Sequence, residues 1–147
     1  MIRTPAVAGR FYPGDIKLLN EVVKGYVQNN VAKIRALGVV APHAGYMYSG
    51  AVAGAVYSRI EIPDTVILLG PNHTGDGPQV SLMAEGSWAM PMGAVSIDTE
   101  LAHEILRGSP TIQSDMKAHV YEHCLETQIP FMQYFRSDFK IVPICVM

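Results

Sequence analysis

Two histidines occupy matching positions in this sequence, and both could bind a transition metal. His43 follows the apolar run 37–41 after one proline, and His73 follows the apolar run 65–69 after Gly-Pro-Asn. Imidazole is the commonest protein ligand for transition metals. Both runs are typical of buried strands, and ligands bind beyond the carboxyl ends of strands in open α/β sheets. We therefore predict that the two imidazoles share one metal site, against the alternative of two unrelated turns.

A transition-metal site needs more than two imidazoles, because non-haem iron and catalytic zinc each take a third protein ligand. Residues 118–126 are rich in donors, with Glu122, His123 and Glu126 close together. A helix over 122–135 would place the two glutamates four positions apart on one face. The alternative is that acidic residues simply stabilise the start of that helix through its dipole. That alternative accounts for the glutamates better than for His123.

Other catalytic patterns are weaker. His119, Glu122 and His123 form the H-x-x-E-H string of one metallopeptidase class, which requires a long helix that carries both histidines. This metallopeptidase hypothesis ranks last. The sequence has no G-x-x-x-x-G-K-[ST] or G-x-G-x-x-G motif, which leaves nucleotide binding unsupported, and no G-x-S-x-G nucleophile elbow.

The composition limits the class of protein. The 147 residues suit one domain, and 49% hydrophobic with 16% charged residues suffices for a packed core. The net charge is -2 and no cluster of basic residues occurs, so we expect no nucleic-acid partner. No apolar stretch approaches the roughly 20 residues that cross a bilayer, and no signal peptide opens the chain, so we expect no membrane partner. Two cysteines do not make a disulfide framework, which favours a cytoplasmic protein.

The pattern of elements predicts an α/β fold, with a mostly parallel sheet covered by helices on both faces and a small antiparallel insertion within 79–97. Helices are expected over 15–30, 50–59, 98–107 and 122–135, and the first three of them should be capped by Asp15, Ser49 and Asp98. Strands are expected over 37–41, 64–69 and 139–147.

The last strand is apolar and ends the sequence. We expect residues 1–147 to be a single domain that is incomplete at its C-terminus. A homo-oligomer through this strand is the other expectation, because an exposed apolar strand edge invites pairing.

Four motifs occur in an order that resembles a known family. They are Arg3–Pro13 (RTPAVAGRFYP), Ala41–Tyr46 (APHAGY), Leu69–His73 (LGPNH) and Glu122–Glu126 (EHCLE). The sequence resembles the N-terminal half of the Memo-like family, which is protein B of the AmmeMemoRadiSam system. That family is similar in fold to the class III extradiol dioxygenases, non-haem iron enzymes that open catechol rings.

The resemblance implies roles for several residues. His43 and His73 match the two histidine ligands of the metal, and Glu122, His123 and Glu126 match a recurring family segment near the pocket. We also expect Tyr46 and Asn72, which stand beside the two histidines in the sequence, to line the pocket. In the family, a third ligand and a further active-site histidine come from the C-terminal half. The third ligand is a cysteine in Memo proteins and a glutamate in the dioxygenases. Neither position is present in this sequence.

These observations lead to two main hypotheses about function. The first is a metal-dependent oxidoreductase of dioxygenase type, with iron favoured over copper or zinc. In it, His123 is either an acid–base residue or a residue that supports the metal ligands. The second is a non-catalytic binding or scaffold module that keeps the pocket, in which case the chain could lack the metal. The expected partner is an unknown small molecule or peptide, or another AmmeMemoRadiSam component.

Overall fold

The computed structural model describes residues 1–147 and places strand β7 (Lys140–Val146) at the centre of a seven-stranded sheet. β7 lies parallel to β2 (Thr65–Pro71) along its whole length. On its other edge β7 pairs in parallel with β5 (Val95–Ile97) and antiparallel with β3 (Val80–Leu82). Apolar and polar residues do not alternate along β7, because successive side chains are buried on both faces of the sheet. The mostly parallel sheet with a small antiparallel part confirms the predicted α/β fold.

Three short strands complete the sheet. β1 (Ile2–Arg3) is parallel to β4 (Ser87–Trp88), which pairs antiparallel with β5, and β6 (Gln113–Ser114) is parallel to β3. β3, β4 and β5 fall within residues 79–97, where the sequence predicted a small antiparallel insertion. β1 and β6 are too short to leave a periodic signal in the sequence.

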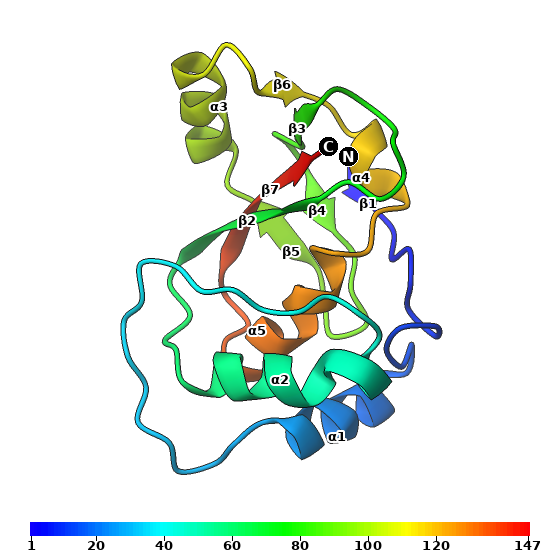
Figure 1. Cartoon of the computed structure of the whole chain (residues 1–147), viewed down its shortest axis with the longest axis vertical. Helices are drawn as coiled ribbons and strands as arrows, with labels where there is room; N and C mark the ends of the chain where they lie inside the picture. Colours follow the sequence, from blue (N-terminus) through cyan, green and yellow to red (C-terminus); the bar gives the residue numbers. More distant parts are fainter.

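The helices gather mainly below the sheet in the view of Figure 1, where α5 (Ile129–Phe135) lies between the sheet and the pair α1 (Ile16–Tyr26) and α2 (Tyr46–Ser58). Asp15 caps α1 as predicted, and its carboxylate accepts the amides of residues 17 and 18. α1 ends at Tyr26 rather than near residue 30, because Val27 is already extended. Asp98 likewise caps α3 (Thr99–Gly108), by accepting the amide of residue 101.

Helix α2 begins four residues before its predicted start. Gly45 is the N-cap residue, and Ser49, the predicted cap, lies inside the first turn. The Ser49 hydroxyl donates to the carbonyl of Ala44 at 2.9 Å. A helix that begins at Tyr46 therefore follows His43 closely and fixes the loop that carries it.

The predicted strand over residues 37–41 is wrong. This segment forms no regular secondary structure, has a bend at Leu37 and pairs with nothing, and Leu37 and Val40 are almost completely exposed. The nearest pairing is a single bridge between Ile34 and Ile60. The β-branched sequence favours a strand, but a strand also needs a neighbour to complete its hydrogen bonds, and none lies beside these residues.

The predicted helix over 122–135 starts too early. The chain forms the short helix α4 (Lys117–Val120), then turns, and resumes as the 3₁₀ helix η1 (Glu126–Gln128) and α5. The Glu122 carboxylate accepts the amides of His123 and Cys124, which holds these residues in a turn. Glu122 and Glu126 therefore do not share a helical face. The long helix required by the metallopeptidase hypothesis is absent as well.

The final strand does not offer a free edge, because β7 has neighbours on both sides. The edge strand on this side of the sheet is β2, which pairs only with β7. No helix of the structure is both long and apolar enough to cross a bilayer.

Candidate metal centre

Three imidazoles from distant parts of the sequence meet at one end of β2. The ring centroids of His43 and His73 are 5.2 Å apart, and those of His73 and His123 are 4.4 Å apart. One ligand atom from each ring lies within 4.8 Å of the other two. The structure thus brings together the two histidines predicted to converge and adds the third. His73 stands two residues after β2, as expected, whereas His43 follows an unpaired segment.

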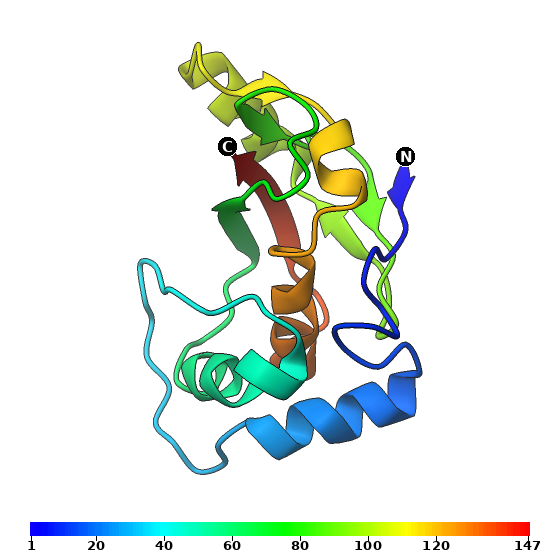
Figure 2. The ribbon, with the colours of Figure 1, turned by 45° about the vertical axis from the view of Figure 1, so that its right-hand side comes forward.

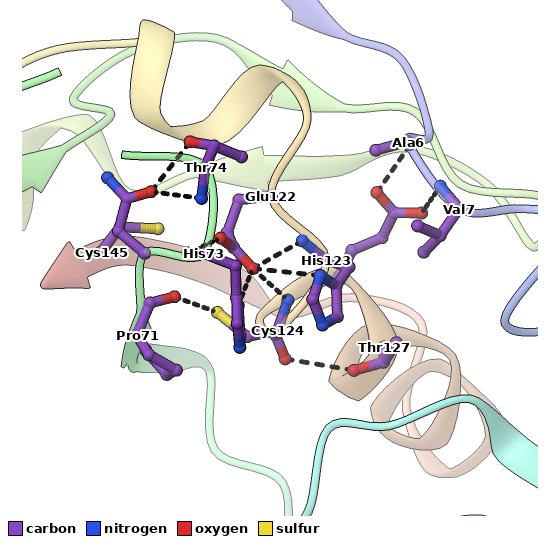
Figure 3. A network of polar contacts seen from close by, with 12 residues as sticks. Ala6, Val7, Pro71, His73, Thr74, Glu122, His123, Cys124, Thr127 and Cys145 are labelled. Carbon is purple, nitrogen blue, oxygen red and sulfur yellow. Dashed lines mark hydrogen bonds and ion pairs between the residues drawn. The ribbon is translucent and has the colours of Figure 1, made fainter. Parts of the chain in front are cut away.

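Glu122 orients His73. Its Oε1 lies 2.8 Å from Nδ1 of His73, and its Oε2 accepts the backbone amide of the same residue at 2.5 Å (Figure 3). With Nδ1 donating to the carboxylate, the Nε2 lone pair of His73 is left free. A histidine that binds a metal through one nitrogen and a carboxylate through the other is a recurrent arrangement, since the carboxylate fixes both the tautomer and the ring.

The Glu122 carboxylate is almost fully buried yet remains ionised. Burial raises its pKa, but hydrogen bonds from the Cys124 amide, the His73 ring and amide, and the His123 amide outweigh burial and lower the pKa to about 2. A carboxylate that accepts several backbone amides is stabilised in its charged form. At neutral pH the group therefore serves as a fixed anion behind His73.

The environment of His123 favours a neutral ring. Burial lowers the pKa of His123, and the neighbouring His73 and His43 lower it further, although Glu122 opposes them. The ring also packs against Phe11 at a centroid distance of 4.8 Å. A neutral imidazole offers a lone pair, which suits either a metal ligand or a proton acceptor.

A second group of donors, formed by His73, Glu122 and Cys124, is also close enough to hold an ion. Two of its members are already engaged. The Glu122 oxygens accept four hydrogen bonds, and the Cys124 thiol donates to the carbonyl of Pro71 at 3.0 Å. The neighbouring Cys145 thiol and burial raise the pKa of Cys124, so it is a neutral thiol rather than a thiolate. The three imidazoles are the better candidate site.

Glu126, which was predicted to lie in the pocket, is completely buried in a different role. Its Oε2 forms a 2.6 Å ion pair with Arg3 and accepts the amide of Ala6, while its Oε1 accepts the Val7 amide and the Tyr12 hydroxyl. The carboxylate thereby ties the N-terminal segment to η1. Its oxygens have no free position for a ligand.

The other two predicted pocket residues, Tyr46 and Asn72, form hydrogen bonds within the protein. The Tyr46 hydroxyl is buried and donates to the carbonyl of Thr127 at 2.8 Å. The Asn72 side chain accepts the amides of Thr74 and Gly75 and donates to the carbonyl of Asp76, which shapes the loop after β2. Asn72 therefore holds the loop that carries His73, whereas Tyr46 packs against Phe131 and contacts no histidine.

His119 lies away from the three imidazoles. The side chain is fully buried in α4, where its Nδ1 is 3.4 Å from the sulfur of Cys145 and its ring packs on Trp88. Its Nε2 has no hydrogen-bond partner. Because His119 is enclosed by the core and only His123 joins the cluster, the H-x-x-E-H string does not form a metal site.

His43 separates two cavities. One, of about 580 Å³, is an apolar cleft between residues 36–41 and β2. The other, of about 570 Å³, is a more open depression lined by His43 and His123 together with Arg10, Phe11 and Tyr48. The depression gives a small molecule access to His43 and His123, beside the aromatic rings of Phe11 and Tyr48 and one cationic side chain.

Comparison with known proteins decides the family. Residues 3–147 match the family described as Memo-like protein. The chain belongs to this family. A "MEMO1 family protein" of Aquifex aeolicus is 49% identical over 149 residues, which cover 99% of this chain and 55% of the relative. Proteins with the same family name from Sulfurisphaera tokodaii and Methanothermobacter thermautotrophicus are each 46% identical, and this chain covers 57% and 56% of their lengths.

The chain therefore spans little more than half the length of these Memo-like relatives.

Sequence reasoning found the histidines through their motifs but missed what Glu122 does. The acidic residue was considered as a ligand or a helix-stabilising charge, whereas its carboxylate orients His73 across 49 residues of sequence. Arg3 was part of a motif without an assigned role, and nothing in the sequence pairs it with Glu126.

Proposed function

We propose that this Memo-like chain provides the histidine face of a centre for a divalent transition metal, with His43, His73 and His123 as nitrogen ligands. The proposal rests on the three imidazoles whose ligand atoms lie within 4.8 Å of one another. Nitrogen ligands about 2.1 Å from a tetrahedral ion lie about 3.4 Å apart, so modest ring rotations would close the site. Iron is favoured over copper or zinc by the resemblance to non-haem iron enzymes, and imidazole suits all three.

The chain's own residues would prepare this site in three ways. Glu122 holds the proton on Nδ1 of His73, which keeps Nε2 available as a ligand. Burial and the adjacent rings keep His123 neutral. Phe11 packs against His123 and limits the positions that its ring can take.

For the full-length proteins of the family, we propose oxidoreductase chemistry of dioxygenase type. Bound iron would supply a redox-active centre with coordination positions left open. The depression lined by Arg10, Phe11 and Tyr48 would hold the substrate, and its aromatic wall with one guanidinium favours an aromatic anion. The acid–base role of His123 stays a prediction for the case in which another residue replaces it as a ligand.

Metal titration tests the ligand set. We expect the metal-free chain to bind Fe²⁺ under anaerobic conditions, with Zn²⁺ titrated for comparison, as measured by isothermal titration calorimetry. His43→Ala, His73→Ala and His123→Ala should each weaken binding by at least about tenfold, since removal of a ligand costs no less than loss of an outer-shell partner.

His103→Ala is the matched control, because His103 lies on α3 and its ring faces Glu85 at 3.6 Å. This control should bind the metal as the unmodified chain does. Equal affinities for all three site variants and the control would contradict the proposed ligands.

A binding module without catalysis is the second candidate. The observation that favours it is that the site offers no anionic ligand, because the carboxylate oxygens of Glu122 and Glu126 all accept hydrogen bonds within the protein. In this case the chain would bind a peptide or another AmmeMemoRadiSam component. Binding that persists in a His43→Ala/His73→Ala variant would support the module, whereas loss of binding with loss of metal would support the metal-dependent function.

A further inference from the structure

The outer edge of β2 is unpaired and apolar. β2 forms all seven of its pairings with β7, so the backbone groups that point away from β7 have no strand beside them. On the faces of the same strand, Ile67 is 52% exposed and Leu69 is 69% exposed. Natural proteins seldom leave a long, regular, apolar edge uncovered, because it pairs readily with another strand.

Residues 37–41 lie across the cleft from this edge, and they too have exposed apolar side chains and no backbone hydrogen-bond partners. They include the apolar residues Leu37, Val39 and Val40, all of them exposed. No backbone hydrogen bond of the protein involves residues 35–41. Figure 1 shows this part of the chain as a loop with no strand drawn along it. A β-branched run without hydrogen-bond partners has the composition of a strand and lacks only a neighbour.

An apolar cleft lies between these two unpaired backbones. The cleft of about 580 Å³ is lined by Leu37 and Val40 of the segment, by Ile67 and Leu69 of β2, and by the buried side chains of Leu125 and Met132. A strand that paired with the free edge of β2 would lie in this cleft, because adjacent strands in a sheet are about 4.8 Å apart and residues 36–41 form the other lining of the cleft. One inserted strand would complete the hydrogen bonds of β2 and of residues 37–41.

We propose that this cleft receives an apolar β-strand from the part of the Memo-like length that this chain does not span. The relatives are nearly twice as long, since the chain covers 55–57% of them, so each has additional residues from which such a strand can come. A second copy of this chain is a poorer occupant. Two β2 edges paired about a two-fold axis would satisfy β2 but would leave both copies of segment 37–41 unpaired.

The insertion has a consequence for the imidazoles. His43 follows segment 37–41 by two residues, and its ring lies at the end of the cleft. A strand that fixes the segment on one side therefore also fixes the chain on which His43 stands, while α2 fixes it on the other. The docking surface and the metal centre are adjacent but separate, because the three imidazoles already meet without the inserted strand.

Co-expression tests the proposal with a defined probe, which is the polypeptide that comprises the part of the Aquifex aeolicus relative not covered by this chain. We expect a stable complex in which amide hydrogen exchange slows over both 37–41 and β2. Ile67→Lys and Leu69→Lys should each weaken the complex by at least about 100-fold, because the ammonium group would be buried without a partner. Leu18→Lys is the control, since Leu18 is a similarly exposed apolar residue on α1.

The free variants should keep the circular dichroism spectrum of the parent chain, because both substituted side chains are exposed in it. Three outcomes would overturn the proposal. They are the absence of a complex on co-expression, a complex in which 37–41 exchanges as fast as in the free chain, and equal binding by Leu69→Lys and Leu18→Lys. Concentration-dependent protection of β2 in the chain alone would instead assign the edge to a second copy.

Discussion

The buried carboxylate of Glu122 links the stability of the protein to the geometry of its histidines. One oxygen accepts the His73 ring and the amides of His123 and Cys124, and the other accepts the His73 amide. A single residue therefore closes the turn that replaces the expected helix and sets the tautomer of a candidate ligand. Because these functions share one carboxylate, a change at Glu122 should affect both folding and metal affinity.

The first prediction concerns pH. The pKa of Glu122 is lowered to about 2 in the folded protein, below its value in the unfolded chain. The carboxylate therefore contributes stability above about pH 4.5, and this contribution is lost as the pH falls towards 2. The shift corresponds to about 3 kcal/mol. We expect Glu122→Gln to lower the free energy of unfolding of the metal-free chain by roughly this amount at pH 7.

Urea denaturation at several pH values between 2 and 7 measures this effect. The difference between the parent chain and Glu122→Gln should shrink steadily as the pH falls, because the parent carboxyl then becomes protonated. A difference that stays constant over this range would show that the charge of Glu122 does not stabilise the fold.

At the scale of elements, glycine in α2 permits an unusually close approach to α1. A Cβ added to Gly54 would lie 2.4 Å from the backbone carbonyl oxygen of Tyr26, which cannot move without moving α1. Gly54→Ala should therefore destabilise the protein by about 1–3 kcal/mol or more through overpacking. Thermal and urea unfolding monitored by circular dichroism measure the change.

Gly25→Ala provides the matched control within α1, where an added Cβ meets no atom within 4 Å. Alanine is the better helix former by about 1 kcal/mol, so this variant should be neutral or more stable. Similar losses for the two variants would mean that close packing of α1 on α2 is not what Gly54 provides.

The elements that the sequence predicted well are those fixed by local interactions. Asp15 and Asp98 cap their helices through amides only two or three residues away, so the local sequence contains every residue that forms the cap. The predictions that were wrong depend on distant partners. Residues 37–41 have the composition of a strand but no neighbour, and the start of the helix expected at Glu122 is replaced by a turn that His73 helps to hold.

The candidate site follows the same rule. The motifs around His43 and His73 predicted that these residues have related roles, and the fold brings their rings together. The sequence could not assign Glu126 correctly, because its partners Arg3, Ala6 and Tyr12 all lie more than 110 positions away. A buried acid and a pocket acid look the same in a sequence when the residue that neutralises them is at the other end of the chain.

At the scale of the whole molecule, Arg3 joins the N-terminus to the site region. Its guanidinium donates to the carbonyls of His119 and Glu122, pairs with Glu126, and stacks over Trp88 at 4.1 Å from the ring centroid. Figure 2 shows the N-terminal segment running down the side of the fold towards α1. The two charges are fully buried, and the fold holds them because they pair with each other and because backbone groups and the Tyr12 hydroxyl satisfy their other hydrogen bonds.

This arrangement predicts strong coupling between residues 123 positions apart. Arg3→Met and Glu126→Gln should each lower the free energy of unfolding by about 3–5 kcal/mol, because each leaves its partner as a buried charge without compensation. The double variant should lose much less than the sum of the two, since no unpaired charge remains. Urea unfolding monitored by the fluorescence of Trp88 measures all three.

Asp138→Asn is the control, because Asp138 pairs with Arg136 at the surface, and it should cost no more than about 1 kcal/mol. Additive losses in the double variant would mean that the N-terminus and the site region are held together by packing around Arg3 rather than by its charge.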